Sequence, residues 1–423
     1  MRTLSIDIET YSPINLAKAG VYKYCNHPDF QILLFSYAED ESTVCTVDLA
    51  SGEQLPAKIL RALDDPAVVK WAYNASFERT CLSAYLGRRL DPAGWRCSMV
   101  WAATLGLPLS LKDVGAVLNL DSQKMSEGKS LIKYFCIPDK HGHQRLPGSD
   151  PDGWRLFKTY NARDVEVETQ IRGKLTNFPV PDYLWEQYEV DQRINDRGIR
   201  IDATLAANAI TIDESHRAQA LARAQELTGL DNPASPLQLQ EWLNQHGCPI
   251  ESMAKESVDD ALAYASGEVK EALELRQELS RSSVAKYRKM MAATCTDQRT
   301  HGLLQFYGAN RTGRWAGRLV QVQNLPRNYL PDLAQARGLV RDGNGEALDM
   351  LYPSMPDTLS QLIRTAFIPS KGHRFIVADY SAIEARVLAW LADEETTLAA
   401  FKNGEDLYCA TASAMFGVPV EKH

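Results

Sequence analysis

The segment Thr3–Glu9 alternates between apolar and polar side chains, and this alternation restricts how the chain can begin to fold. Three leucine or isoleucine residues share one side of the segment, and two acidic residues, Asp7 and Glu9, share the other. Side chains of a β-strand point alternately to opposite faces. The pattern therefore predicts a strand with one buried face and two carboxylates projecting together from the other. Taken alone, it is also compatible with an exposed polar face.

Strand patterns dominate residues 1–100, and helical patterns follow them. The expected strands cover 3–9, 31–38, 43–48 and 68–73, with one helical pattern at 56–63. Residues 154–175 are expected to form one long helix. This order predicts an α/β domain that ends near residue 175. Two prolines at 177–181 mark a boundary after it.

The remainder of the chain changes character twice. Residues 184–296 show mostly helical patterns, including a helix that begins with Ser235 as N-cap and proline at its first position. From Gly302 onward, short apolar strands and glycines dominate. Within this region, Phe375–Asp379 is expected to be a buried strand, followed by a helix.

Cysteine usage and hydropathy exclude several classes of protein. The eight cysteines are scattered without any CxxC pair, which indicates reduced thiols in the cytoplasm. Cys136, His141 and His143 lack the fourth ligand that a structural zinc site needs. No run of about 18 apolar residues occurs, so neither a membrane span nor a secretory signal is expected.

The charge of the chain is unevenly distributed. The whole sequence carries a formal net charge of −8, whereas ten basic and two acidic residues between Arg276 and Arg327 give that stretch +8. The stretch is either a solvated basic face or a track for a polyanion such as nucleic acid.

Further acidic residues extend the pair on the first strand. Tyr160 and Asp164 lie four positions apart in a helical segment and so share a face, and Glu78 lies at a helix start after the strand at 68–73. In order and type, the set formed by Asp7, Glu9, Glu78, Tyr160 and Asp164 resembles the DEDDy 3′→5′ exonucleases of the ribonuclease H-like fold. The resemblance covers residues 1–175.

This resemblance implies two-metal phosphodiester hydrolysis with Mg²⁺ or Mn²⁺, two ions per active site. It implies that Asp7 bridges both ions, that Glu9 and Asp164 help to hold the first, and that Tyr160 with Glu9 orients the attacking water. Glu78 departs from the aspartate usual in this family, which leaves the geometry at the second ion open.

Two later segments resemble the family A DNA polymerases. Thr312-Gly-Arg-Trp-Ala-Gly-Arg-Leu-Val-Gln-Val-Gln-Asn-Leu-Pro326 is similar to their TGR…QNIP primer–template segment, and Asp379-Tyr-Ser-Ala-Ile-Glu-Ala-Arg386 is similar to their motif DYSQIELR. Taken alone, the first segment is also compatible with a structural loop. The resemblance implies that Arg314, Gln323 and Asn324 hold the primer–template. Residues 327–360 exceed the family's link and are interpreted as an insertion.

The second segment implies the elements of a polymerase site. Asp379 would ligate both catalytic ions, the Tyr380 carbonyl would assist, and Glu384 would press on the nucleotide sugar to exclude a 2′-hydroxyl. The alternative for Glu384 is a capping box with Ser381. Ala382 replaces the family's glutamine. Within the basic stretch, three further residues are expected to contact the DNA backbone: Lys286, Arg288 and Lys289.

These observations predict an exonuclease domain at 1–178, a helical thumb-like region at 184–300, and the start of an α+β palm with the entry to the fingers at 301–423. The predicted activity is template-directed DNA synthesis with 3′→5′ proofreading. The fingers helix and second catalytic acid are not found by residue 423, so these residues alone are expected to act only as an exonuclease.

The expected partners are primer–template DNA, single-stranded 3′ ends and, in the full-length protein, deoxynucleoside triphosphates. The protein is expected to be a monomer in the cytoplasm, that of the host if a phage encodes it. Two alternatives remain, a free-standing 3′→5′ exonuclease and a non-catalytic DNA-binding protein.

Overall fold

The computed structural model describes residues 1–421 apart from 41, 121–124, 126 and 281–283. Arg281 of the basic stretch therefore lies outside the described residues. The chain forms two compact units, Met1–Ile368 and Pro369–His423, and each is described by itself. Among the residues described, no helix combines the length and apolar character needed to cross a bilayer.

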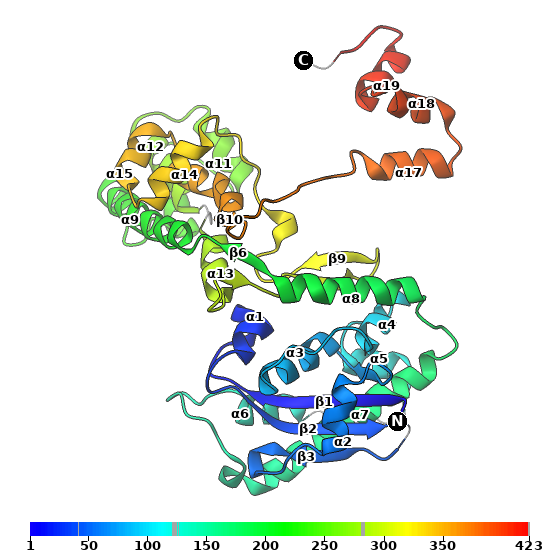
Figure 1. Cartoon of the computed structure of the whole chain (residues 1–423). Coiled ribbons are helices and arrows are strands. Elements are labelled where there is room, and N and C mark those ends of the chain that lie inside the picture. Colours follow the sequence, from blue (N-terminus) through cyan, green and yellow to red (C-terminus); the bar gives the residue numbers. More distant parts are fainter. Residues whose placement is uncertain (41, 121–124, 126, 281–283, 422–423) are drawn as a thin grey trace. The chain divides into compact units, whose positions relative to one another are not determined.

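A five-stranded mixed sheet organises the first part of the larger unit (Figure 1). The central strand β1 (Thr3–Tyr11) pairs antiparallel with β2 (Gln31–Glu39) and parallel with β4 (Val69–Ala72). The edges are β3 (Cys45–Asp48) and β5 (Trp95–Cys97). The four strands predicted from alternation and apolar runs are all present. Sequence reasoning missed β5, which has only three residues.

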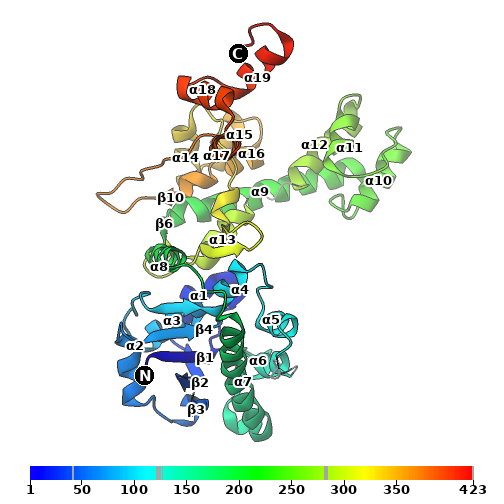
Figure 2. The ribbon, with the colours of Figure 1, turned by 90° about the vertical axis from the view of Figure 1, so that its right-hand side faces the viewer.

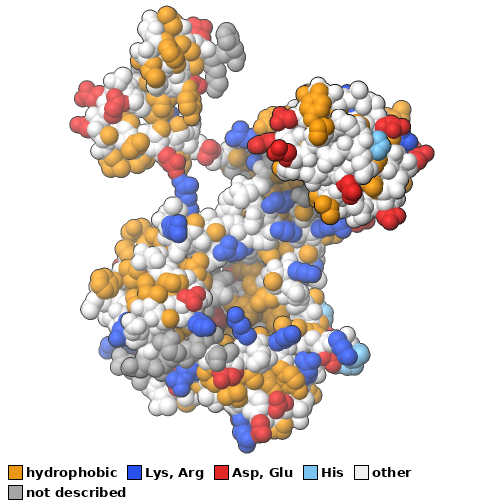
Figure 3. Space-filling model, turned by 180° about the vertical axis from the view of Figure 1, so that it is seen from behind, with side chains coloured by type: hydrophobic (Ala, Val, Ile, Leu, Met, Phe, Trp, Pro, Cys, Tyr) orange, Lys and Arg blue, Asp and Glu red, His pale blue; other side chains and the backbone are white. Residues whose placement is uncertain are grey.

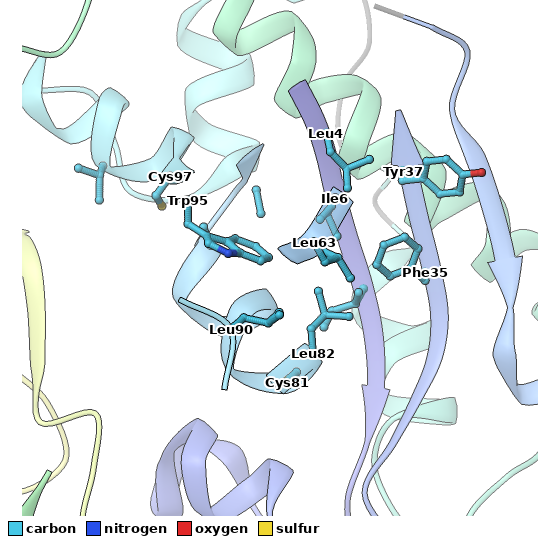
Figure 4. Packing of buried hydrophobic residues seen from close by; sticks show 14 of the residues in the cluster. Leu4, Ile6, Phe35, Tyr37, Leu63, Cys81, Leu82, Leu90, Trp95 and Cys97 are labelled. Carbon is cyan, nitrogen blue, oxygen red and sulfur yellow. The ribbon is translucent and has the colours of Figure 1, made fainter. Parts of the chain in front are cut away.

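Helices cover both faces of this sheet. Leu4 of β1 lies in one buried cluster with Leu82, on the side of α2 (Ala57–Asp64) and α3 (Ala75–Tyr85) (Figure 4). The long α7 (Pro151–Leu175), predicted over 154–175, contacts β1 and β2 and covers the face that carries the carboxylates (Figure 2). The other helices here are α1 (Leu16–Cys25), α4 (Ser98–Thr104), α5 (Leu111–Val117) and α6 (Gly128–Phe135).

The next helix, α8 (Asp182–Arg197), begins after the prolines that suggested a boundary. Trp185 and Tyr188 of this helix nevertheless belong to the same buried cluster as the sheet. The connection at 177–181 is therefore a turn between packed elements. The threefold division at 178–184 and 300–301 stays a prediction.

The helical region predicted over 184–296 is present. Its longest helix is the 26-residue α9 (Ala203–Thr228), and α12 (Gly267–Ser280) and α13 (Ala285–Ala293) pack along it. As predicted, Ser235 is the N-cap of the following helix and Pro236 its first residue. The helices after α9 are α10 (Pro236–Gln245), α11 (Lys255–Leu262), α12 (Gly267–Ser280) and α13 (Ala285–Ala293).

Short strands and helices complete the larger unit. A small sheet joins β6 (Ile199–Ile201) to β7 (Arg299–Thr300) and β10 (Phe367–Ile368). A hairpin of β8 (Leu304–Ala309) and β9 (Arg314–Gly317) carries the polymerase-like segment. The segment interpreted as an insertion forms α14 (Leu333–Arg341), α15 (Gly345–Leu351) and most of α16 (Met355–Gln361).

The smaller unit corrects the strand predicted at 375–379. Residues 375–379 form no strand, and Val377 is 90% exposed rather than buried. A strand needs a hydrogen-bonding neighbour, and the described residues of this unit form no other strand. The N-cap of α17 (Ile383–Leu391) is Ala382 and not Ser381, the residue named in the capping-box alternative for Glu384. The helices α18 (Glu395–Asn403) and α19 (Leu407–Phe416) follow.

Candidate functional site

The two carboxylates of β1 lie where the strand meets α7. Asp7 is partly exposed and Glu9 is 8% exposed. The pairing of β1 with β2 shifts register between Glu9 and Thr10. Such irregularities bend a strand and redirect its side chains, and they are common beside active sites. The strand presents both carboxylates on one face, as the alternation predicted, and the register shift follows directly after Glu9.

Glu78 reaches the same region from α3. The connection from β4 passes through Asn74, whose φ of 80° places it in the left-handed region. Glu78 follows in the first turn of the helix and is 4% exposed. Burial, and then the charge of Asp7, hold the pKa of Glu78 well above its usual value. Among the described residues, its Oε2 has no hydrogen-bond partner. A buried carboxylate with an open oxygen is suited to a cation.

Tyr160 and Asp164 share the buried face of α7, as their spacing predicted. They are 1% and 4% exposed. Burial is the main cause that raises the pKa of the Tyr160 hydroxyl, and the negative charges of Asp164, Glu9 and Asp7 add to it. The tyrosine therefore stays protonated at neutral pH, and its hydroxyl is hydrogen-bonded to Asp164. The structure thus brings together the five side chains predicted to form the exonuclease site.

Asn161, which sequence reasoning missed, fixes the orientation of Asp7. Its Nδ2 donates to Asp7 Oδ2 over 2.6 Å, and its Oδ1 accepts from Ser36 Oγ over 2.5 Å. Ser36 in turn lies 2.7 Å from the hydroxyl of Thr46. Asn161 is fully buried. This series of hydrogen bonds runs from β3 through β2 and α7 to the carboxylate, and it holds one oxygen of Asp7 in place.

Gly128 supports the ring of Tyr160. A Cβ at position 128 would lie 2.1 Å from Cε2 of the ring. The absence of a side chain at the start of α6 therefore lets the ring occupy its position. Cys136 follows this helix, with Sγ 3.8 Å from Glu9 Oε2. Both contacts join segments that are far apart in the sequence, so no local sequence pattern predicts them.

A cavity of about 770 Å³ opens beside Glu9. Its walls come from the end of β1, the start of α1 and the end of α6, and they are mostly apolar. Pro13, Phe77 and Ile137 are among the lining residues. The cavity can hold a flat apolar group with a polar edge next to the carboxylates.

The donor chemistry of this site fits hard divalent cations. Asp7, Glu9, Glu78 and Asp164 offer only oxygens, which Mg²⁺ and Mn²⁺ prefer. Within the described ranges, no three His, Cys, Asp or Glu side chains already stand in an arrangement that holds a metal ion. Glu78 has an oxygen without a hydrogen-bond partner, and its pKa is raised by burial and by neighbouring carboxylates. Both features fit a site whose carboxylates would come together around bound cations.

The predicted DNA-contacting residues of the polymerase-like segment lie on and after the β8–β9 hairpin. Arg314 and Asn324 are exposed. Gln323 lies in the short helix η3 (Val322–Asn324), and its Oε1 would be 2.2 Å from a Cβ at Gly317. Gly317 therefore lets η3 fold closely against the hairpin. The structure brings these three residues onto one continuous segment.

The predicted basic contacts lie on α13, next to this segment. Lys286 Nζ donates to the carbonyl of Val320 over 2.6 Å, and its pKa is lowered by burial and then by the charge of Lys289. Lys289 is exposed, and Arg288 pairs with Glu214 over 2.8 Å.

A cavity of about 780 Å³ joins Lys286 and Asn324. It extends between α11, α12, α13 and α16, where Lys255 and Gln277 also line it. Lys and Arg side chains are spread across the larger unit in Figure 3. Two of the predicted contacts thus share one hollow, although they lie far apart in the sequence.

Asp379, Tyr380 and Glu384 belong to the smaller unit. Asp379 and Tyr380 lie on an exposed extended segment, and Tyr380 is 80% exposed. Glu384 lies in the first turn of α17. Their predicted roles remain predictions.

Comparisons with known proteins agree on the family. The profile of DNA polymerase family A matches residues 207–423. The DNA polymerase of Bacillus phage SP02 is 51% identical over the whole chain, which spans 66% of that protein's length. DNA polymerase I of Rhizobium leguminosarum is 58% identical over 59 residues, which are 14% of this chain and 6% of that protein.

A solved structure shares the fold. It is described as the "POL domain of Pol1 from M. smegmatis complex with DNA primer-template and dNTP", and it matches with a TM-score of 0.59 and 17% sequence identity. The match covers 98% of this chain and 64% of that one. With the match to the family profile and the identity to a phage polymerase, the chain belongs to the family A DNA polymerases.

Proposed function

We propose that this chain is part of a template-directed DNA polymerase that proofreads through a 3′→5′ exonuclease domain of ribonuclease H-like fold in residues 1–178. The observation that carries the exonuclease is the gathering of four buried or half-buried carboxylates and a buried tyrosine beside an apolar cavity. Family membership supports the polymerase, and the β8–β9 hairpin distinguishes the chain from a free-standing exonuclease.

The exonuclease would use two divalent ions held by Asp7, Glu9, Asp164 and Glu78. When bound, these ions would supply an activated water and neutralise the departing 3′-oxygen. Tyr160, kept protonated by its surroundings, would orient the water together with Glu9. Asn161 donates to Asp7 Oδ2 and so would fix the orientation of this carboxylate when ions are bound.

The cavity beside Glu9 would bind the terminal nucleotide. Its apolar walls suit the faces of a base, and Thr10 and Ser12 offer polar groups at its edge. Stacking of this kind discriminates little between bases, which suits an enzyme that removes any mispaired nucleotide. Only a frayed, single-stranded end can enter such a cavity.

Cleavage of a single-stranded DNA labelled at its 5′ end tests this part of the proposal. We expect stepwise shortening from the 3′ end that requires Mg²⁺ or Mn²⁺, and its loss in Asp7→Ala and in the double variant Asp7→Ala/Glu9→Ala. Glu166→Ala is a matched control, because this residue lies on α7 but is 42% exposed and pairs with Arg163. Cleavage at the parental rate by the double variant would refute the site.

For the polymerase, we propose that the helices of 184–300 act as a thumb and that 301–423 forms the start of a palm. Duplex DNA would lie along the hairpin and α13, contacting Arg314, Gln323, Asn324 and the basic residues of α13. Asp379, with the Tyr380 carbonyl, would hold two ions for nucleotide addition, and Glu384 would exclude ribonucleotides. The mycobacterial structure that shares the fold contains primer–template and dNTP, which supports DNA and deoxynucleotides as partners.

Salt dependence tests the duplex track. The logarithm of duplex affinity should fall linearly with the logarithm of salt concentration, with about 0.9 of slope for each phosphate contacted. The double variant Arg288→Glu/Lys289→Glu should lower this slope by about 1.8. Lys174→Glu, an exposed change on α7, should leave it unchanged. Equal slopes for the double variant and the parent would show that α13 is a solvated basic face that does not contact DNA.

A further inference from the structure

The β8–β9 hairpin is held by a partly buried hydrogen bond between Trp315 and α8. The indole Nε1 of Trp315 donates to Asp191 Oδ1 over 2.8 Å. Asp191 is 1% exposed. The indole ring also packs edge-on against Phe306 of β8, with ring centroids 5.1 Å apart. Trp315 therefore ties both strands of the hairpin to the helix that follows the exonuclease domain.

Three hydrogen-bond donors point at the Asp191 carboxylate, which accepts from all of them when it is ionised. Besides Trp315, Gln192 Nε2 and Asn195 Nδ2 donate to Asp191 Oδ2 over 2.9 and 3.1 Å. Neither amide can turn over without loss. Gln192 Oε1 accepts from Arg79, and Asn195 exchanges two hydrogen bonds with the backbone of Leu304. A carboxylate satisfies all three donors, whereas an amide would place a fourth donor among them.

The same network reaches the exonuclease domain. Arg79, the residue after Glu78 on α3, is 1% exposed and makes two hydrogen bonds to Asp196 of α8, over 2.7 and 3.0 Å. At the far end of the hairpin, Asn310 Nδ2 donates to the carbonyl of Leu107 over 3.2 Å. The hairpin is thus joined to residues 1–178 directly through Asn310 and indirectly through α8.

Strand geometry links this anchor to DNA. Neighbouring residues of a strand face opposite sides, so the inward position of Trp315 turns Arg314 outward, where it is exposed. A cavity of about 270 Å³ lies between α8 and the hairpin, lined by Asp191, Asn195 and Gln305 among others. The hairpin therefore has room to shift if the indole bond is lost.

We propose that Asp191 and Trp315 are positioning residues for the primer–template. They hold the hairpin against α8 and the exonuclease domain, and so present Arg314 to the duplex. The inference rests on the proposed binding of duplex DNA along the hairpin. It adds that a polymerase contact is oriented by the domain expected to proofread.

The test compares binding of a duplex primer–template with cleavage of single-stranded DNA. Trp315→Phe keeps the ring but removes the donor, and we expect duplex affinity to fall about tenfold while single-strand cleavage is unchanged. Asp191→Asn should give a similar loss, and the double variant should be no weaker than the weaker single variant, since both break one contact. Trp101→Phe is the matched control, because its indole donates to Phe178 instead, over 2.7 Å.

Arg314→Ala separates the two levels of the argument. If Arg314→Ala weakens duplex binding but Trp315→Phe does not, the positioning role is wrong and the proposed function stands. If Arg314→Ala binds the duplex like the parent, the proposed duplex track fails and the positioning role fails with it. An equal loss of duplex binding and single-strand cleavage in Trp315→Phe would show a general structural role and overturn the inference.

Discussion

Replacing Gly128 by alanine should disable the proposed exonuclease while leaving the fold intact. The new Cβ would lie 2.1 Å from Cε2 of Tyr160, whereas an ordinary contact begins at 3.4 Å. The ring must therefore retreat by about 1.3 Å, or α6 must shift by the same distance. Displacing a catalytic group by about 1 Å costs on the order of 100-fold in rate. The backbone at Gly128 is already helical, so alanine causes no conformational strain there.

The assay is single-turnover cleavage of a short single-stranded DNA at saturating Mg²⁺. We expect Gly128→Ala to cleave about 100-fold more slowly than the parent and to bind duplex DNA with parental affinity. Gly173→Ala is the control, because it lies on the same helix as Tyr160 with open space around it. That change should leave the rate unchanged and stabilise α7 by up to about 1 kcal/mol. Parental cleavage by Gly128→Ala would refute the role given to the ring position.

Three further outcomes follow from buried charges. Burial raises the pKa of Asp191 from 3.8 to about 7. Between these two values the folded chain keeps a proton on Asp191 that the unfolded chain has released. This difference contributes up to about 4 kcal/mol to the free energy of unfolding at low pH, and the contribution is lost as pH rises to 7. Asp191→Asn should therefore gain stability relative to the parent between pH 5 and pH 8 in urea unfolding, and a constant difference would contradict this. Arg79→Met should lower unfolding stability by about 3–5 kcal/mol, because it leaves Asp196 buried without its cation; a urea-unfolding loss below about 1 kcal/mol would contradict it. Mn²⁺ at about 100 times its Kd should raise the melting temperature of the parent by about 5–10 °C but not that of Asp7→Ala, measured by thermal shift; an equal rise in both would remove Asp7 from the site.

Local patterns predicted the elements that local physics determines. The alternation at 3–9 was enough to predict β1 and the shared direction of Asp7 and Glu9, because the period of a strand depends on the backbone alone. The four-residue spacing of Tyr160 and Asp164 likewise predicted their common face. These patterns cover the sheet and most of the carboxylates.

Contacts between distant segments could not be predicted in this way. Asn161 meets Asp7 across 154 positions, and nothing about a single amide in a helix reveals such a partner. The predicted strand at 375–379 was wrong for a related reason. Apolar residues favour a strand, but the strand forms only where another chain segment pairs with it. The packing of α8 on the sheet domain was not predicted, because prolines indicate where a turn lies but not which segments pack together after it.

The buried cluster beneath the sheet has a practical consequence for dissecting the protein. It includes Phe306 of the hairpin together with Trp185 and Tyr188 of α8, so the apolar surface of residues 1–178 is completed by later residues. Cutting the chain near residue 180 would expose hydrophobic surface on both fragments, and both fragments would tend to aggregate. The proposed nuclease activity is therefore better removed by single substitutions at the carboxylates than by deleting residues 1–178.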